Sequence, residues 1–212
     1  MLKDWTRDEL EKHYIGKMKA TTIPVNISIS GQQRILEMRE LENIIRNAKV
    51  LSQDSCTCRK KFKHCDKPLE GCIGLDDDAI DSIANNGGKR ITAKRALTLL
   101  KQSYDAGLVH LAYVFEGKDK IERICSCCSC CCHSLSAAIR FGYSDHVFSS
   151  KLIADQNQDK CDNCGACVER CHFGARRLDI ETEELVFEQK KCFGCGLCLE
   201  SCSNHAINMV DR

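Results

Sequence analysis

The alternation of apolar and polar residues near the start of the chain predicts a strand followed by a helix. Ile23, Val25, Ile27 and Ile29 alternate with polar residues, which is the period-two pattern of a half-buried strand. Apolar residues then recur at helical spacing over residues 35–48. The N-terminal half therefore mixes both kinds of element.

Two more helices are predicted further along. A short helix over Asp76–Ala84 is broken by an Asn-Asn-Gly-Gly sequence. Thr92 is a typical N-cap for a helix that runs to Ala106, with Gly107 as its stop signal.

A β-hairpin is predicted next. Val109–Phe115 and Lys120–Ile124 are rich in strand-forming residues, and a short polar loop containing Gly117 separates them. The second strand leads the chain directly into a cysteine-rich run that begins at Cys125.

Cysteine dominates the composition, with 18 among 212 residues, whereas the formal net charge is only +1. The near-neutral charge gives no reason to expect a nucleic-acid partner. No apolar run approaches the roughly 18 residues that span a bilayer, and the polar N-terminus lacks the apolar core of a signal peptide. We therefore expect a cytoplasmic protein without membrane insertion, whose reduced thiols serve as metal ligands rather than disulfides.

The cysteines fall into four groups. The first 150 residues contain ten: Cys56, Cys58, Cys65 and Cys72, then Cys125, Cys127, Cys128, Cys130, Cys131 and Cys132. The remaining eight are Cys161, Cys164, Cys167 and Cys171, then Cys192, Cys195, Cys198 and Cys202. The last two groups share the spacing C-x2-C-x2-C-x3-C at an offset of 31 residues, which indicates an internal duplication.

This repeated spacing favours iron-sulfur clusters over zinc. Three thiolates spaced by two residues can wrap three irons of one cubane, and the glycines between them let backbone amides approach the sulfurs. Zinc sites normally use two C-x2-C pairs that are separated by a longer spacer.

Over Leu152–Val210 the sequence resembles the bacterial two-cluster 4Fe-4S ferredoxins. The resemblance implies that the fourth cysteine of each run binds the other cluster. One cluster would then take Cys161, Cys164, Cys167 and Cys202, and the other Cys192, Cys195, Cys198 and Cys171. The proline that follows the fourth cysteine in that family is His172 in one run and Ser203 in the other. We expect His172 and His205 to lie near clusters or in solvent without binding them.

The ten N-terminal cysteines follow no standard zinc or ferredoxin spacing. If the second run stayed extended, Cys125, Cys127 and Cys131 would point to one side. Cys128, Cys130 and Cys132 would point to the other side, and the loop from Cys56 to Cys72 would supply the missing ligands. One or two further 4Fe-4S clusters, one cluster plus a zinc site, or a larger double cluster all use similar numbers of thiolates.

The fold class that follows is α+β. We expect an N-terminal Cys-rich domain of helices and a hairpin over residues 1–150 and a two-cluster ferredoxin domain over residues 151–212, joined by the polar stretch 149–160. The N-terminal half also loosely resembles uncharacterised 4Fe-4S-binding proteins of anaerobes, through Cys56-Thr57-Cys58-Arg59 and Gly107-Leu108-Val109-His110. That resemblance implies cluster binding in anaerobic metabolism but no assigned reaction.

The function that best fits these features is electron transport. Clusters with four thiolates have no open coordination position, and no familiar nucleotide-binding or hydrolase motif is present. The chain would relay low-potential electrons to or from a partner oxidoreductase. One alternative is a redox-sensing transcriptional regulator, since the two helices and the hairpin resemble a winged helix with basic residues at Lys89, Arg90, Lys94, Arg95 and Lys101. The other alternative is a redox enzyme subunit whose N-terminal domain holds a cluster with an open coordination position.

Overall fold

The computed structural model describes residues 3–23, 41–143 and 146–212. Most of the strand predicted over residues 23–29 and the first part of the helix predicted over residues 35–48 lie outside this part of the chain. Residues 41–47 are helical, which agrees with the second prediction.

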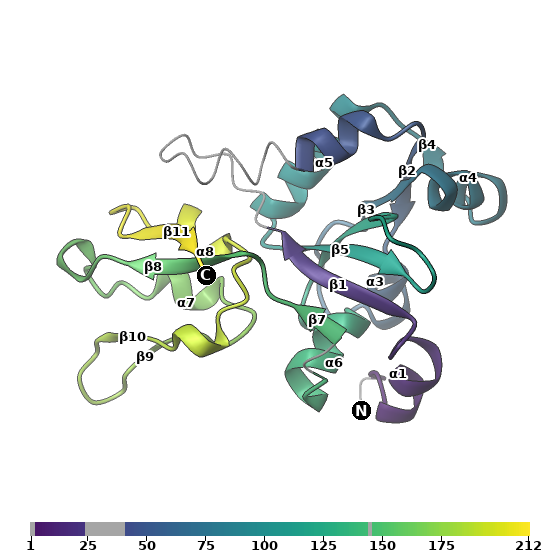
Figure 1. The fold of residues 1–212 in the computed structure, drawn as a ribbon. Helices are drawn as coiled ribbons and strands as arrows, with labels where there is room; N and C mark the ends of the chain where they lie inside the picture. The colour runs from purple at the N-terminus through teal and green to yellow at the C-terminus, as the bar shows by residue number, and fades with distance from the viewer. Residues whose placement is uncertain (1–2, 24–40, 144–145) are drawn as a thin grey trace.

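A seven-stranded sheet organises the N-terminal part, residues 1–150 (Figure 1). Its strands are β1 Met18–Ile23, β2 Leu51–Ser55, β3 Glu70–Leu75, β4 Lys89–Arg90, β5 Val109–Phe115, β6 Arg123–Cys127 and β7 Val147–Phe148. They lie in the order β4-β2-β3-β6-β5-β1-β7. All neighbours pair antiparallel except β1 and β7, which are parallel.

Helices cover both faces of this sheet. They are α1 Arg7–His13, α3 Thr57–Phe62, α4 Asp76–Asn85, α5 Ala93–Asp105 and α6 His133–Phe141. The predicted N-cap of α5 is confirmed, because the Thr92 hydroxyl accepts a hydrogen bond from the Arg95 backbone N–H. Gly107 follows the helix with a φ of 74°, which completes the predicted stop.

The two faces of the sheet differ in chemistry. Ile73 and Ile124 are register partners on β3 and β6, and they pack against Leu100 of α5 in an apolar core. Cys72 precedes Ile73 on β3, and Cys125 follows Ile124 on β6; these two cysteines are also register partners. Since successive side chains of a strand point to opposite faces, Cys72 and Cys125 lie on the face opposite to the two isoleucines. Both faces carry a hydrophobic core, and the face of Cys72 and Cys125 also presents thiols.

The predicted hairpin is confirmed as β5 and β6, although β6 begins three residues later than expected and continues through Cys127. Both strands lie in the interior of the sheet, with β3 beyond β6 and β1 beyond β5. The hairpin is thus not a free wing, which removes the main structural argument for the winged-helix interpretation.

The C-terminal part, residues 151–212, consists of two short sheets and two short helices. β8 Leu152–Gln156 pairs with β11 Ile207–Asp211, and β9 Arg176–Leu178 pairs with β10 Leu185–Phe187. The helices are α7 Ala166–Glu169 and α8 Leu197–Glu200, and 3-10 turns lie at Gln158–Lys160 and Gln189–Lys191. The mixed content of helix and strand agrees with the predicted α+β class.

One expectation for the connection between the two parts was wrong. The stretch 149–160 was expected to be a polar joint, yet its residues 152–156 form β8, in which Leu152, Ile153 and Ala154 are buried. The sequence did not indicate this strand because its last two residues, Asp155 and Gln156, are polar. They belong to the strand because they pair with Asn208 and Ile207 of β11.

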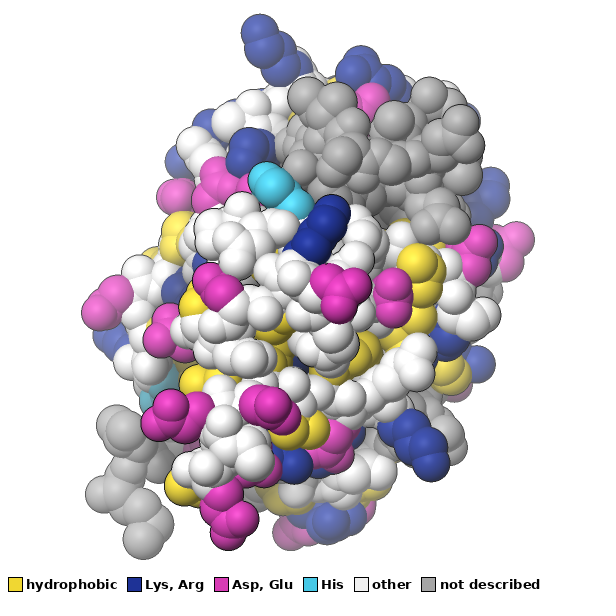
Figure 2. All heavy atoms as spheres, turned by 90° about the vertical axis from the view of Figure 1, so that its left-hand side faces the viewer, with side chains coloured by type: hydrophobic (Ala, Val, Ile, Leu, Met, Phe, Trp, Pro, Cys, Tyr) yellow, Lys and Arg dark blue, Asp and Glu magenta, His cyan; other side chains and the backbone are white. Residues whose placement is uncertain are grey.

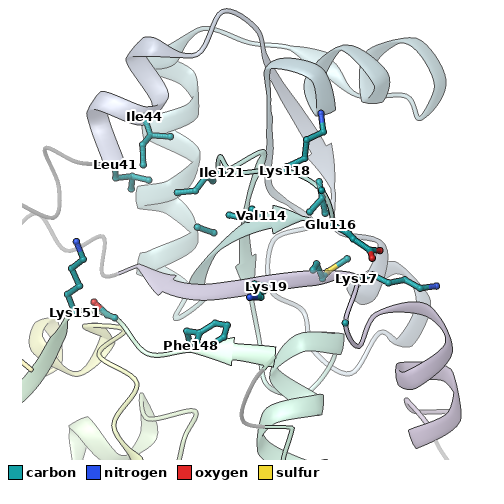
Figure 3. Close-up of a pocket in the computed structure, with 16 residues that line it drawn as sticks. Lys17, Lys19, Leu41, Ile44, Val114, Glu116, Lys118, Ile121, Phe148 and Lys151 are labelled. Carbon is teal, nitrogen blue, oxygen red and sulfur yellow. The ribbon is translucent and has the colours of Figure 1, made fainter.

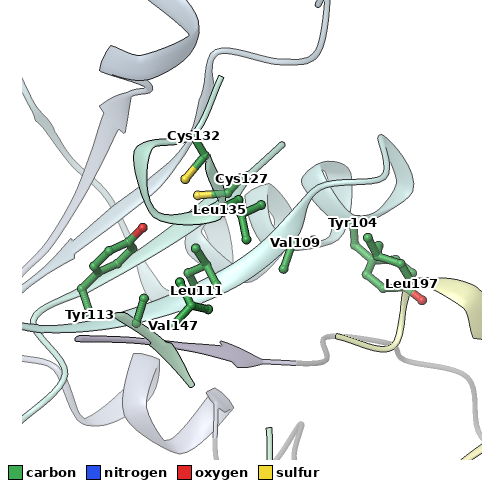
Figure 4. Packing of buried hydrophobic residues seen from close by; sticks show 10 residues of the cluster. Tyr104, Val109, Leu111, Tyr113, Cys127, Cys132, Leu135, Val147 and Leu197 are labelled. Atoms are coloured by element: carbon green, nitrogen blue, oxygen red, sulfur yellow. The ribbon is translucent and has the colours of Figure 1, made fainter. Parts of the chain in front are cut away.

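The two parts of the chain share a hydrophobic core. Leu197 at the start of α8 packs in the same cluster as Tyr104, Val109 and Leu135 (Figure 4). The Tyr104 hydroxyl also donates a hydrogen bond of 3.0 Å to the carbonyl of Gly196. The C-terminal part therefore rests on the sheet domain through the loop that carries its second cysteine run.

Candidate metal centres

Seven of the ten N-terminal cysteines line one cavity of about 190 Å³ at the cysteine-bearing face of the sheet. Six of them give it the name used here, the six-thiol cavity: Cys56, Cys58, Cys72, Cys125, Cys127 and Cys132. The seventh, Cys128, also belongs to a second and tighter group of thiols. Since a water molecule occupies about 30 Å³ of liquid, the space exceeds what one metal ion needs. The cysteines come from two strands, β3 and β6, and from the starts of α3 and α6, so long-range pairing creates this set.

The thiols of this cavity contact one another in sequence around its wall. Cys56 hydrogen-bonds with Cys58 and with Cys72, Cys72 with Cys125, and Cys125 with Cys127. Cys127 in turn contacts Cys132. Hydrogen bonds from their neighbours hold the pKa values of Cys56 and Cys125 well below the ordinary range, whereas those of Cys58, Cys72 and Cys127 are raised. Cysteine sulfurs arranged in this way would bind metal as thiolates.

Arg59 lies at the wall of the same cavity and is almost completely buried, with 1% of its surface exposed. Its Nη1 donates a hydrogen bond of 2.8 Å to the carbonyl of Ser126, but its Nε and Nη2 have no hydrogen-bond partner in the described structure. Burial lowers the pKa of Arg59, but the surrounding cysteines, led by Cys56, raise it overall. A buried guanidinium with two unpaired N–H groups calls for an anionic partner. Thiolates and sulfides of a bound cluster would meet that need.

Three further side chains at this cavity were not identified from the sequence. Tyr113 on β5 and Arg123 on β6 are register partners, and Arg123 lies two positions before Cys125 on the same face of β6. His133 begins α6 directly after the cysteine run. Arg123 is held by both carboxylate oxygens of Asp78, at 2.9 Å each. Burial lowers the pKa of His133 to about 3, so its ring is neutral. The period-two spacing from Cys125 back to Arg123 was the available signal for the second of these residues.

The other four N-terminal cysteines form a separate and much tighter group, here called the four-thiol set. Its members are Cys65, Cys128, Cys130 and Cys131, and their sulfurs all lie within 4.8 Å of one another. The Cys65–Cys128 and Cys130–Cys131 sulfur pairs are each 3.8 Å apart. The sequence-based prediction that Cys131 shares a side with Cys125 and Cys127 was therefore wrong, because β6 ends at Cys127 and residues 129–131 form a turn.

In the C-terminal part, two cavities each bring together four cysteines from both runs. Cys171 lines one cavity with the second run's Cys192, Cys195 and Cys198. Cys202 lines the other with the first run's Cys161, Cys164 and Cys167. This crossed grouping is the one that the ferredoxin resemblance implies for the ligands.

The two runs also have the same local structure, as expected for a duplication. Each begins after a 3-10 turn, and each has a glycine, Gly165 or Gly196, as the left-handed N-cap of a four-residue helix. The φ values of 74° and 77° are strained for any residue with a side chain. The fourth sulfur of each run accepts a backbone N–H four residues later, from Ala175 to Cys171 at 3.3 Å and from Ala206 to Cys202 at 3.2 Å.

A buried arginine lies between the two C-terminal cavities. Arg176 has 3% of its surface exposed, and its Nη1 contacts the Cys167 sulfur at 3.9 Å while its Nη2 has no partner in the described structure. Burial raises the pKa values of Cys167 and Cys198, and the positive charge of Arg176 counteracts this for both. The residue therefore stabilises negative charge on either side.

His172 links the two parts of the chain rather than offering a free ligand nitrogen. Its Nε2 lies 2.8 Å from the carbonyl of Gly107 and must donate, since that oxygen only accepts. Its Nδ1 lies 2.9 Å from the hydroxyl of Ser129, which lies between two cysteines of the four-thiol set. His205 is exposed, as expected.

Figure 3 shows the residues that line a larger cavity of about 670 Å³. Apolar side chains such as Val114, Ile121 and Phe148 line it together with lysines that include Lys19 and Lys118. Met18 and Phe115 line both cavities, so they form a shared wall.

Two further findings concern the chain as a whole. No helix in the described residues has the length and apolar character that a bilayer span requires. A search of curated proteins finds none that matches this chain.

A family comparison does match one part of it. Residues 160–207 match the family model of the 4Fe-4S dicluster domain. The matched range contains both C-x2-C-x2-C-x3-C runs and none of the ten N-terminal cysteines. The C-terminal part is therefore similar to 4Fe-4S dicluster domains, whereas the loose N-terminal resemblance gains no support.

Proposed function

We propose that this chain is an electron-transfer protein that relays low-potential electrons between a donor and a partner oxidoreductase. The observation that carries the proposal is the pair of C-terminal cavities, each lined by four cysteines in a range that matches a 4Fe-4S dicluster domain. When bound, 4Fe-4S clusters supply one-electron transfer at potentials that the protein tunes.

The eight C-terminal cysteines would hold two such clusters. The first set is Cys161, Cys164, Cys167 and Cys202, and the second is Cys192, Cys195, Cys198 and Cys171. Four thiolates for each cluster leave no open position, so the donor chemistry fits electron transfer rather than substrate binding. Arg176 would hold the negative charge of both sets, and the N–H groups of Ala175 and Ala206 would stabilise the fourth thiolates.

The six-thiol cavity would hold a further iron-sulfur cluster. Its donor set consists entirely of thiolates, which select iron-sulfur or zinc chemistry, and its volume exceeds the need of one ion. The unpaired Nε and Nη2 of Arg59 provide buried N–H donors for an anionic group.

The contacts between the two parts support a relay from one to the other. Cys195, a member of the second C-terminal set, packs against the same core as Cys127 and Cys132 of the six-thiol cavity. Tyr104 bridges the two parts through its hydrogen bond to Gly196. The chain itself would thus keep the centres in fixed positions.

The opposite end of the C-terminal part would meet the partner protein. Cys164 is exposed there, and the exposed carboxylates of Asp159 and Asp162 lie close to it in the sequence. Figure 2 shows Asp and Glu side chains distributed over this face of the molecule. A partner with a basic docking surface would be attracted to it, with a rate that falls as ionic strength rises.

The test is spectroscopic and uses the full-length protein purified without oxygen. Reduction with dithionite should produce magnetically coupled EPR signals from neighbouring clusters, and the reduced protein should donate electrons to an acceptor such as cytochrome c without converting a small molecule. A protein that lacks acid-labile sulfide, or whose reduced form gives no EPR signal, would contradict the proposal.

A second candidate function, a redox enzyme subunit, is favoured by one observation. The 670 Å³ cavity borders the six-thiol cavity through Met18 and Phe115, so a bound molecule there would lie next to the thiols. A change in the EPR spectrum on adding small organic anions, lost in Phe115→Trp but not in Ile180→Trp on the far surface, would favour this function. An unchanged spectrum would leave electron transfer as the function.

A further inference from the structure

The four-thiol set has a geometry unlike that of the other fourteen cysteines. Its sulfurs all lie within 4.8 Å of one another, and no other group of three or more cysteines in the described part of the chain meets that limit. The C-terminal cysteines, which match a dicluster domain, provide an internal reference, since their sulfurs are spread around cavities.

The sulfur separations have the size expected for one tetrahedral ion. A zinc–sulfur bond of about 2.3 Å places the corners of a tetrahedron about 3.8 Å apart. The Cys65–Cys128 and Cys130–Cys131 pairs are both separated by 3.8 Å. Four irons and four sulfides would not fit among sulfurs that are so close.

Hydrogen bonds to backbone carbonyls hold three of the four residues, Cys128, Cys130 and Cys131, in place. The indole N–H of Trp5 donates to the carbonyl of Cys131 at 2.8 Å, and Nδ1 of His64 lies 3.0 Å from the carbonyl of Cys130. Cys132 N–H closes the turn onto the carbonyl of Cys128 at 3.1 Å. These hydrogen bonds fix the backbone of the turn, and in that conformation its three sulfurs lie close to the sulfur of Cys65.

The surroundings suit a structural ion. Trp5, Phe62 and Leu108 pack around the set in an apolar core, with Cys128 and Cys131 fully inside it. Cys65 comes from the loop between α3 and β3, whereas the other three come from the turn before α6. An ion here would tie two segments that are more than 60 residues apart in the sequence.

We propose that the four-thiol set binds a single zinc ion in a closed tetrahedral site and is not a ligand set for an iron-sulfur cluster. The site would fix the loop after α3 against the turn before α6 and so hold the wall of the six-thiol cavity in shape. This proposal goes beyond electron transfer and does not depend on it.

The experiment measures zinc in the full-length protein, purified without oxygen and with iron and zinc both supplied during expression. We expect about one zinc per chain, and the zinc-edge X-ray absorption spectrum should contain four sulfur neighbours at about 2.3 Å and no nearby iron. Cys65→Ser should reduce the bound zinc at least tenfold in competition with a chelator. Cys65→His should retain it, with three sulfur neighbours and one nitrogen.

The matched control is Cys164→Ser, which changes an exposed C-terminal cysteine. It should lower the iron content and leave the zinc content unchanged. If Cys65→Ser does not fold, the wild-type spectrum and the Cys65→His variant still test the site. Absence of zinc from the wild type, wild-type zinc bound through nitrogen or oxygen, or a loss of about four irons in Cys65→His would overturn the proposal.

Discussion

The two halves of this chain place cysteines by different means. In the C-terminal part, each cavity is lined by four cysteines. Three of them come from one cysteine run, and the fourth comes from the other run. In the N-terminal part, the groups assemble only when β3 pairs with β6 and the turn after β6 meets the loop after α3. Local spacing thus encodes the first kind of centre, whereas tertiary structure creates the second.

The comparison teaches that cysteine count alone does not define the centres. Eight C-terminal thiols divide evenly between two cavities. The ten N-terminal thiols form a six-thiol cavity and a compact four-thiol set, and Cys128 of the set also lines the cavity. The buried arginines follow the same division, with Arg176 between the C-terminal cavities and Arg59 at the six-thiol cavity. Each variant below tests one element of this contrast.

The largest effect is expected from breaking the crossed grouping. Cys202→Ala removes a sulfur from the cavity of Cys161, Cys164 and Cys167, so the protein should lose about four irons and the EPR signal of that cluster. Cys171→Ala should remove the other signal instead. Separate iron analysis and EPR of both variants check this, and loss of the cluster nearest in sequence to the substituted cysteine would refute the crossing.

Arg59→Met should have opposite effects on the metal-bound and metal-free protein. The buried guanidinium stabilises an anionic occupant, so iron bound at the six-thiol cavity should be lost more readily. In metal-free protein the same change removes an unpaired buried charge, so the free energy of unfolding should rise by about 1–3 kcal/mol. Denaturant unfolding of both forms measures this, with Lys60→Met as the exposed control. Equal changes in the two forms would show that Arg59 does not face a bound anion.

His172→Ala should weaken the contact between the two parts of the chain. The side chain makes hydrogen bonds to Gly107 and Ser129, each contributing about 0.5–1.5 kcal/mol, so the variant should lose about 1–2 kcal/mol in the free energy of unfolding. Hydrogen exchange should also increase at the residues around Gly107. His205→Ala, which changes an exposed residue, is the control. If the two variants behave alike, His172 has no linking role.

The smallest effect is expected from Arg176→Met. Removal of a buried positive charge near Cys167 and Cys198 makes reduction of either C-terminal cluster less favourable. Both reduction potentials should fall by on the order of 50 mV. This shift corresponds to about 1.2 kcal/mol, since 100 mV is worth about 2.3 kcal/mol for one charge. Redox titration followed by EPR measures the two shifts. A shift in only one cluster would place Arg176 beside that cluster alone.

The sequence predicted the C-terminal part well because its information is local. The sequence predicts strands over residues 177–180, 185–187 and 206–210, and about two helical turns in each cysteine run. β10 has the predicted bounds, and β9 and β11 agree to within one or two residues. Among the C-terminal strands only β8 was missed, because two of its five residues are polar and its partner β11 lies some 55 residues later. The four-residue helices are shorter than the two turns expected, since the left-handed glycines delay their start.

The N-terminal sites could be predicted only in part. The alternation of Cys125 and Cys127 on one face is confirmed, because β6 runs through both. Beyond that point an extended chain was assumed, and no spacing rule indicated the turn over residues 129–131. The pairing of Cys72 with Cys125 depends on the register of two strands that are separated by α4, β4, α5 and β5, which no local pattern specifies.

The most direct test of the whole account is a crystal structure of the anaerobically purified protein with anomalous maps collected at the iron and zinc edges. The account predicts two iron clusters between the crossed C-terminal cysteine sets, a third iron centre within the six-thiol cavity beside Arg59, and one zinc peak among the four thiols at Cys65. Iron confined to the C-terminal part, with an N-terminal half that holds only zinc or free thiols, would contradict it.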